Sequence, residues 1–370
     1  MESVYTEFKF LADAIHNTIT SANTSKHPVS ARDAFFRTAS YYRAATFFLA
    51  QNQSDERLFE VWDTQMRDFD SALALSDIKG ERVTVKGPGF DIPVIFWAAP
   101  GSEARPTVLI GSGYDASQEE SFHYLGRAVL DRGCNLATYE GPGQPTVRRQ
   151  QGLGFISNWW DVVTPVVDYL SSRNSEVDED KIALVDVSFG GTLAPLAASR
   201  EHRLAAVLVI DGLVSFQDAI LSQIPAEVAE LYTSGAEADF NEYMNAVRLN
   251  PLSPKIFRFV INQGLWSFAT ESPYDWFARL GKFRLDEDVV GNMTCPVFVG
   301  SGEDDTFAPG QPEELQKMLG DKGYYHLFET KLGAGEHCQL GAEAQLAQVA
   351  FDWLETVFEG VGGKGNGTVM

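Results

Sequence analysis

The chain has little of three things: cysteine, positive charge and long apolar runs. Its three cysteines, Cys134, Cys295 and Cys338, are scattered over 370 residues, too few and too far apart for a disulfide framework or a cysteine-rich metal site. Lysine and arginine together number 29 against 51 acidic residues, which gives a formal charge of −22. Such a field repels phosphate backbones, so we expect no nucleic acid partner.

No stretch approaches the roughly 18 apolar residues of a membrane-spanning helix, and the first residues lack the basic start and apolar core of a secretion signal. With so few cysteines, these absences favour a cytoplasmic protein with no membrane partner. Core-forming residues, by contrast, are abundant: 44% of the chain is hydrophobic, enough for one large domain with insertions or two modest ones.

Periodicity divides the chain into segments. Residues 1–77 carry apolar side chains at helical intervals, which predicts an N-terminal helical segment. Over residues 78–359 short apolar strands alternate with helices, a pattern typical of an α/β protein with a mostly parallel, doubly wound sheet. An aromatic-rich helical insertion at about 212–290 is expected to be a lid. The glycine-rich residues 360–370 predict a flexible tail.

Individual elements follow from the same pattern. A helix is expected over residues 119–132, after the first parallel strand. The expected strands are residues 82–85, 92–97, 107–110, 134–139, 181–187, 204–210, 296–299 and 324–328.

The most informative stretch is Leu184–Gly191, where an apolar strand enters a tight turn at Ser188 and small residues follow. This pattern is typical of a nucleophile elbow, usually written G-x-S-x-G, in which a serine sits on a sharp strand-to-helix turn. Asp186 replaces the first glycine. Two hypotheses for Asp186 stay open: a buried carboxyl that braces the turn through hydrogen bonds, or a tuned acid near the pocket.

A serine hydroxyl needs a histidine base, and the histidine needs an acid to hold its tautomer. Asp305 and His337 follow Ser188 in the chain order typical of hydrolases with an elbow of this kind, each on a loop after a late strand. Asp304 is an alternative candidate for this acid. We prefer Asp305 because of its spacing from Gly302 and Pro309 in the loop. Cys338 is a weaker candidate nucleophile, because it directly follows His337 and adjacent side chains rarely point at each other.

An oxyanion hole needs backbone N–H groups. Phe189, directly after the nucleophile, is one expected donor, and Gly113 or Tyr114, after the first parallel strand, is the other. Further candidates for tuning or substrate contact are Asp115, Trp159 and Trp266, the tryptophans because they suit a flat apolar ligand. A dinucleotide fingerprint, a phosphate-binding loop and zinc-ligand spacing are all missing, so we expect no metal and no organic cofactor.

These motifs together resemble a branch of the α/β-hydrolases. That branch includes the 2,6-dihydroxypseudooxynicotine hydrolase type and the fungal polyketide chain-shortening hydrolases of the naphthopyrone and melanin pathways. Glu140 stands where an aspartate is more usual in the branch. The segments that carry the resemblance are Gly113–Asp115, Glu140–Gln144, Ser188–Gly191, Phe307–Gln311 and Gly335–Gln339.

The resemblance implies an α/β-hydrolase fold with the triad Ser188, Asp305 and His337. It also implies an N-terminal helical segment that helps to cover the pocket, and it allows a homodimer, since members are often dimers. Several members cleave a carbon–carbon bond beside a ketone and release an acyl fragment.

The motifs predict a serine-dependent hydrolase, and the resemblance implies a role in fungal secondary metabolism. Its expected target is a carbonyl of an aromatic or polyketide-like small molecule, at a carbon–carbon bond beside a ketone or in an ester or lactone. Two alternatives stay open. One is a cyclase or acyltransferase that uses the same pocket. The other is a hydrolase-fold binding protein that has lost catalysis.

Overall fold

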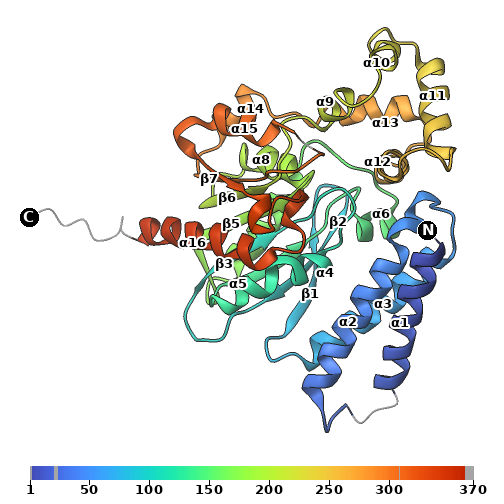
Figure 1. The fold of residues 1–370 in the computed structure, drawn as a ribbon. Coiled ribbons are helices and arrows are strands. Elements are labelled where there is room, and N and C mark those ends of the chain that lie inside the picture. The colour runs from blue at the N-terminus through green and yellow to red at the C-terminus, as the bar shows by residue number, and fades with distance from the viewer. Residues whose placement is uncertain (1, 21–23, 308, 363–370) are drawn as a thin grey trace, which may run out of the picture. The chain divides into compact units, whose positions relative to one another are not determined.

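The computed structural model describes residues 2–20, 24–307 and 309–362, and the chain forms two compact units (Figure 1). Unit 1 consists of the chain up to residue 81 together with residues 241–266, and unit 2 contains the rest.

Unit 1 is helical. Helix α2 packs against both α1 and α3, and Ala12, Tyr42 and Val61 from the three helices form a buried cluster. In α12, Phe259 stacks on Phe47 with ring centroids 5.1 Å apart. The elements of this unit, two of which cross its boundary, are α1 (Glu2–Thr20), α2 (Pro28–Phe47), η1 (Phe48–Gln51), α3 (Arg57–Leu75), α11 (Glu237–Leu249) and α12 (Lys255–Ser267).

An eight-stranded sheet of order β1-β2-β4-β3-β5-β6-β7-β8 organises unit 2. Strand β4 is antiparallel to β2, and the pairs from β4–β3 to β7–β8 are parallel, so the predicted mostly parallel sheet is confirmed. The strands are β1 (Gly80–Lys86), β2 (Asp91–Trp97), β3 (Arg105–Ile110), β4 (Asn135–Tyr139), β5 (Val177–Val187), β6 (Ala206–Ile210), β7 (Val297–Gly302) and β8 (Gly323–Phe328).

Helices cover the sheet (Figure 1). Helices α7 and α8 pack on each other and on β5, while α16 packs on α5 and on β5, β6 and β7. The helices of unit 2 are α4 (Gln118–Ser121), η2 (Phe122–Gly126), α5 (Arg127–Asp131), α6 (Pro145–Gln151), α7 (Trp160–Ser172), α8 (Gly190–Ala198), α9 (Phe216–Leu221), α10 (Ala226–Thr233), α13 (Pro273–Leu280), α14 (Glu287–Asn292), α15 (Gln311–Leu319), η3 (Gly320–Lys322), η4 (Thr330–Leu332), η5 (His337–Gln339) and α16 (Glu343–Gly362).

The helix expected over residues 119–132 is present as α4, η2 and α5, in which η2 is a π-helical turn. In this turn Phe122 stacks on Trp97 of β2, and the Tyr124 hydroxyl donates to the Cys338 carbonyl. Both contacts are with segments distant in sequence, so the local periodicity carries no sign of them.

Strand register puts the carboxyl ends of the parallel strands at one edge of the sheet. Val187 pairs with Ile210, which pairs in turn with Gly300, and Gly302 pairs with Phe328 at the end of β8. Ligands of open α/β sheets bind outside this edge. The loops that follow β3, β5, β6, β7 and β8 therefore start next to one another.

The stretch between β6 and β7 contains helices α9 to α14. Residues 241–266 of this stretch belong to unit 1, and the predicted lid role of 212–290 stays a prediction. Helix α16 continues to Gly362, and the rest of the expected tail lies outside the described residues. Over the described ranges, no helix combines the length and apolarity that crossing a bilayer requires.

Candidate active site

Ser188 lies at the turn between β5 and α8. Its φ of 55° is in the left-handed region, which is costly for a side chain other than glycine and is tolerated where the surroundings fix it. The Ser188 N–H donates to the Ile210 carbonyl at 2.8 Å, and the Gly191 N–H donates to the Ser188 carbonyl at 2.8 Å. These bonds hold the strained turn and leave the half-buried Ser188 side chain at the carboxyl edge of the sheet.

The structure brings Ser188, His337 and Asp305 together. The Nε2 atom of His337 is 2.9 Å from Ser188 Oγ, and Nδ1 is 2.9 Å from Asp305 Oδ2. At the latter contact the N–H is not aligned for a regular hydrogen bond, and such contacts often tighten when substrate binds. The other Asp305 oxygen accepts from the Phe307 N–H at 2.8 Å.

Opposing influences act on the pKa of His337. Burial lowers it, but negative charge at Cys338 and the Asp305 carboxylate raise it, and the net direction is upward. Because burial raises the pKa of the Cys338 thiol, that thiol is neutral near pH 7 and cannot supply the charge. The Asp305 carboxylate is therefore the partner that stabilises a proton on His337.

Two competing candidates have different surroundings. The Asp304 carboxylate accepts from the Thr330 hydroxyl at 2.7 Å and is exposed, whereas Asp305 faces His337. Cys338 is buried, and its raised pKa makes it a poor nucleophile. The Nε2 atom that would activate a nucleophile already faces Ser188.

The predicted oxyanion donors border the elbow. Phe189 is the N-cap residue of α8, where N–H groups have no acceptor within the helix. Gly113 lies so close to the elbow that a Cβ on it would be 2.9 Å from the Val187 carbonyl oxygen and 3.2 Å from Ser188 Cβ. Tyr114 is buried, and its ring packs edge-on against Phe189 at 5.8 Å.

Asp186 is fully buried beneath the elbow. Its Oδ2 accepts from the Tyr139 hydroxyl at 3.1 Å, and Trp159 donates its indole N–H to the same hydroxyl at 3.2 Å. The carboxyl fills space that two glycines leave free: a Cβ on Gly111 would lie 2.1 Å from Asp186 Oδ1, and one on Gly190 would lie 2.9 Å from it.

Burial raises the pKa of Asp186 well above its usual range, against the hydrogen bond from Tyr139, which lowers it. Among the described residues, Asp186 Oδ1 has no hydrogen-bond partner. An ionised carboxylate with one bare oxygen would be very costly here, so burial favours the protonated, neutral form of Asp186. The hydrogen bond to the Asp186 carboxyl comes from Tyr139 of β4, and a role in bracing the turn stays a prediction.

We expect Asp186→Asn to be tolerated, because the amide has the same shape and is also neutral. At acid pH, where the unfolded carboxyl is protonated as well, the free energy of unfolding should stay within about 1 kcal/mol of the wild type. The value of kcat/KM should stay within about threefold from pH 6 to 8. Asp186→Gly should cost about 1–3 kcal/mol, since it opens a cavity and leaves the Tyr139 hydroxyl without its acceptor.

The pH dependence of stability provides the control for this comparison. A native pKa above the unfolded value means that the contribution of Asp186 is lost as pH rises through the native pKa. Denaturant titrations should therefore show the wild type losing stability toward alkaline pH relative to Asp186→Asn. A fall in kcat for Asp186→Asn without a fall in stability would instead favour the tuned-acid hypothesis.

The other predicted contact residues differ in position. Trp159 is fully buried and engaged with Tyr139, and Asp115 is half-buried beside Tyr114. Trp266 belongs to unit 1, and its contact with substrate stays a prediction. The rings of two predicted oxyanion donors, Tyr114 and Phe189, belong to a cluster of buried rings within unit 2. Neighbouring centroids are 5.1–6.4 Å apart in this cluster, which contains Tyr114, Phe155, Phe189, Phe216 and Phe283.

Asp211 is a functional candidate that sequence reasoning missed. It directly follows β6, is fully buried and has a left-handed φ of 48°. Its Oδ1 accepts from the Gly302 N–H at 2.6 Å, while Oδ2 accepts from the Cys338 N–H and from Gln339 Nε2, the latter at 3.0 Å. The sequence feature that could have identified Asp211 is its position directly after a buried strand, at the sheet edge where Ser188 lies.

Asp211, His337 and Cys338 form the kind of group that can hold a metal, with ligand atoms within 4.8 Å of one another. Here both Asp211 oxygens accept hydrogen bonds, and the two His337 nitrogens face Ser188 and Asp305. These contacts fit a hydrogen-bonded catalytic loop better than a set of ligands open to a cation.

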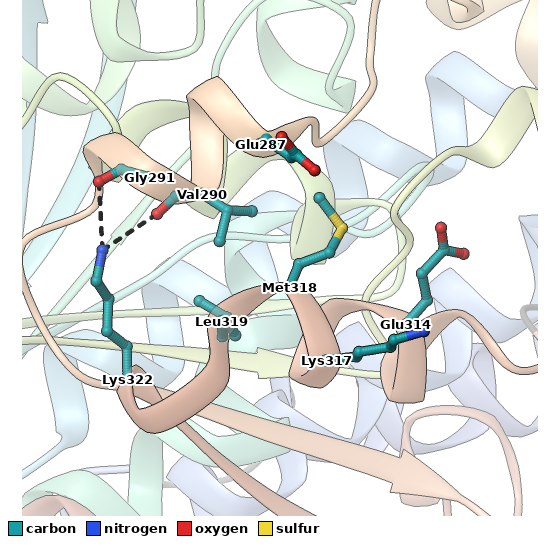
Figure 2. Close-up of a pocket in the computed structure, with 8 residues that line it drawn as sticks. All are labelled: Glu287, Val290, Gly291, Glu314, Lys317, Met318, Leu319 and Lys322. Carbon is teal, nitrogen blue, oxygen red and sulfur yellow. Dashed lines mark hydrogen bonds between the residues drawn. The ribbon is translucent and has the colours of Figure 1, made fainter.

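A pocket of about 490 Å³ lies between α14 and α15 (Figure 2). The Lys322 ammonium beside it donates to the carbonyls of Val290, Gly291 and Met293, at the end of α14, which is a helix-capping arrangement. None of the residues predicted for the site lines this pocket.

Comparisons with known proteins show which proteins this chain is similar to. No family model matches the chain. Hydrolase acrC of Aspergillus aculeatus is 27% identical over 365 residues, which cover 91% of this chain and 84% of that protein. The 20-hydroxy-prefusarin hydrolase FUS2 of Gibberella moniliformis is 26% identical over 343 residues, with coverage of 88% and 80%.

Among solved structures, the crystal structure of the 2,6-dihydroxy-pseudo-oxynicotine hydrolase superposes with a TM-score of 0.71 at 21% identity, covering 96% of this chain and 87% of that one. The chain therefore has the α/β-hydrolase fold, as predicted. Its predicted resemblance to the branch with fungal hydrolases is confirmed.

Proposed function

We propose that this α/β-hydrolase-fold protein is a serine-dependent hydrolase that acts on a carbonyl of an aromatic or polyketide-like small molecule. The observation that carries the proposal is the continuous arrangement of Ser188 Oγ, the two nitrogens of His337 and Asp305 Oδ2, with both contact distances at 2.9 Å. Nucleophile, base and orienting acid are thus within reach of one another, which is the geometry that acyl transfer requires.

In the proposed reaction, Ser188 Oγ attacks the substrate carbonyl while His337 Nε2 takes the hydroxyl proton. Asp305 holds His337 through Nδ1 and stabilises the imidazolium that forms. The N–H groups of Phe189 and of Gly113 or Tyr114 stabilise the oxyanion. His337 then returns its proton to the leaving group, a carbon at a ketone or an oxygen in an ester or lactone, and water releases the acyl fragment from Ser188.

The substrate class rests on the ring cluster around Phe189 and Tyr114 and on the relatives. Aromatic rings close to a nucleophile suit a flat apolar ligand, and one relative carries the name of a hydrolase of 20-hydroxy-prefusarin. The same proposal includes a role in fungal secondary metabolism and a homodimer. It also includes a cytoplasmic location, which suits the three unpaired cysteines.

The test is covalent labelling of Ser188. A fluorophosphonate should add one phosphonyl group to the wild type, which peptide mass spectrometry should locate at Ser188. Ser188→Ala should remain unlabelled while binding ligand and unfolding like the wild type. Wild-type protein that binds an aryl ketone tightly yet resists labelling would contradict catalysis and favour a binding protein.

Product analysis in ¹⁸O-labelled water separates hydrolysis from its alternatives. A hydrolase incorporates one solvent oxygen into the released acid, whereas a cyclase or acyltransferase incorporates none. A product free of solvent oxygen would overturn hydrolysis and retain Ser188 as the nucleophile.

A further inference from the structure

The segment Glu140–Gln144 follows β4 and has no part in the proposed reaction. Gln144 at its end is fully buried. Its Oε1 accepts from the Gly141 N–H at 2.8 Å, and its Nε2 donates to the Ser112 carbonyl at 2.7 Å. Longer contacts link Nε2 to Ser112 Oγ at 3.1 Å and to the Gly113 carbonyl at 3.4 Å. An N–H faces the amide oxygen and carbonyls face the amide nitrogen, so these neighbours fix the orientation of the amide.

These carbonyls belong to the peptide groups that carry the predicted oxyanion donors. The Ser112 carbonyl shares a peptide group with the Gly113 N–H, and the Gly113 carbonyl shares one with the Tyr114 N–H. In a planar trans peptide the C=O and N–H point in opposite directions. The two carbonyls face Gln144, so the Gly113 and Tyr114 N–H groups must point away from it.

The loop that carries these peptides runs beside the nucleophile. The contact of Gly113 with the elbow is so close that a Cβ there would be 3.2 Å from Ser188 Cβ and 3.4 Å from the Phe189 nitrogen. A rotation of either peptide plane would redirect an N–H near the reacting carbonyl.

Glu140 holds the far end of the same loop. It is fully buried, its Oε1 accepts from the Gln118 N–H at 2.9 Å, and its Oε2 accepts from the Thr146 N–H at 2.5 Å. Within the loop, the Ser112 hydroxyl donates to the Ala116 carbonyl at 2.7 Å. The loop is thus fixed at both ends by side chains of one short segment.

We propose that Gln144 is a positioning residue for the oxyanion hole: its amide NH₂ holds the peptide planes of the Ser112–Gly113–Tyr114 loop so that their N–H groups face the oxyanion formed at Ser188. This inference rests on the proposed function, because it assumes that Ser188 attacks a carbonyl and that an oxyanion forms there.

The experiment is Gln144→Glu, which keeps the shape of the side chain and an acceptor for the Gly141 N–H. Above the pKa of the introduced glutamate, which burial raises, its carboxylate has no hydrogen to donate to the Ser112 and Gly113 carbonyls. We expect the second-order rate constant for phosphonylation of Ser188 by a fluorophosphonate to fall about 10²-fold, the usual cost of a lost oxyanion donor. Affinity for an uncharged aryl ketone should change little, since the ground state makes no use of the hole.

Gln311→Glu is the matched control. Gln311 is also buried, and its amide makes a similar pair of bonds, accepting from the Ser215 N–H at 2.9 Å and donating to the Ser215 carbonyl at 3.0 Å. This variant should lower the thermal midpoint to a similar extent but keep the rate of phosphonylation within about threefold. Equal losses of rate in the two variants would show a general packing effect and overturn the inference.

Acid pH supplies a second readout. Protonation of a buried glutamate returns an O–H donor to the Ser112 carbonyl, so the ratio of Gln144→Glu to wild-type rates should rise as pH falls, and a flat ratio would contradict the inference.

If Gln144→Glu does not fold, Gln144→Met serves for the rate comparison. Wild-type protein that resists labelling would refute the proposed function, whereas labelling at equal rates in wild type and folded Gln144 variants would refute only the inference.

Discussion

Asparagine in place of Asp305 is expected to lower kcat/KM for an activated aryl ester such as p-nitrophenyl acetate by about 10⁴-fold, as removal of the orienting acid does in other triads. Asp305 Oδ2 is 2.9 Å from His337 Nδ1. An asparagine amide can present its NH₂ group to Nδ1, which favours the tautomer with the proton on Nε2. In that tautomer His337 cannot accept the proton of Ser188.

Asp304→Asn is the matched control for this prediction. It makes the same chemical change one residue away, at a carboxylate that accepts from the Thr330 hydroxyl and does not face His337. Its kcat/KM should stay within about threefold of the wild type. Equal losses in the two variants would show that loop structure, and not the contact with His337, is responsible. A large loss of kcat/KM in Asp304→Asn alone would show that Asp304, and not Asp305, is the acid that orients His337.

The positions of Ser188, Asp305 and His337 were accessible from sequence because each follows an apolar strand, and strand register then brings the ends of β5, β7 and β8 to one edge. Local pattern and chain order together specify such residues. The burial of Asp186 could be predicted from sequence as well. An elbow leaves little room at that position, so a side chain that replaces the usual glycine must be enclosed.

Asp211 and Gln144 could not be assigned in this way. Gln144 acts on a loop 32 residues earlier in the chain, and Asp211 binds a loop 127 residues later. Neither contact could be predicted from periodicity or residue spacing, because each depends on how loops from different strands pack together. The division of residues 212–290 between the two units was inaccessible for the same reason, since helical periodicity does not say which core a helix joins.

Removal of the Asp211 carboxylate should produce the largest loss of stability. Asp211→Ala is expected to lower the free energy of unfolding by about 3–5 kcal/mol, because it leaves three buried donors without an acceptor: the Gly302 N–H, the Cys338 N–H and the Gln339 amide. Alanine also tolerates a left-handed φ of 48° less well than aspartate or asparagine. Asp211→Asn keeps one oxygen acceptor and the local conformation, so it should cost only about 1–2 kcal/mol.

Denaturant titration across pH tests this prediction. Burial raises the pKa of Asp211 from 3.8 to about 6, and repulsion from Asp305 adds to the shift. Between these values the native state keeps a proton that the unfolded chain releases, so the contribution of Asp211 to wild-type stability should fall by roughly 3 kcal/mol as pH rises through the window. That fall should be absent from Asp211→Asn.

Amide hydrogen exchange at Gly302 and Cys338 should accelerate in Asp211→Ala, and unchanged protection there would contradict the assigned hydrogen bonds. Because Cys338 adjoins His337, loss of these bonds should lower kcat as well, which would show that one buried carboxylate supports both the acid loop and the base loop of the site.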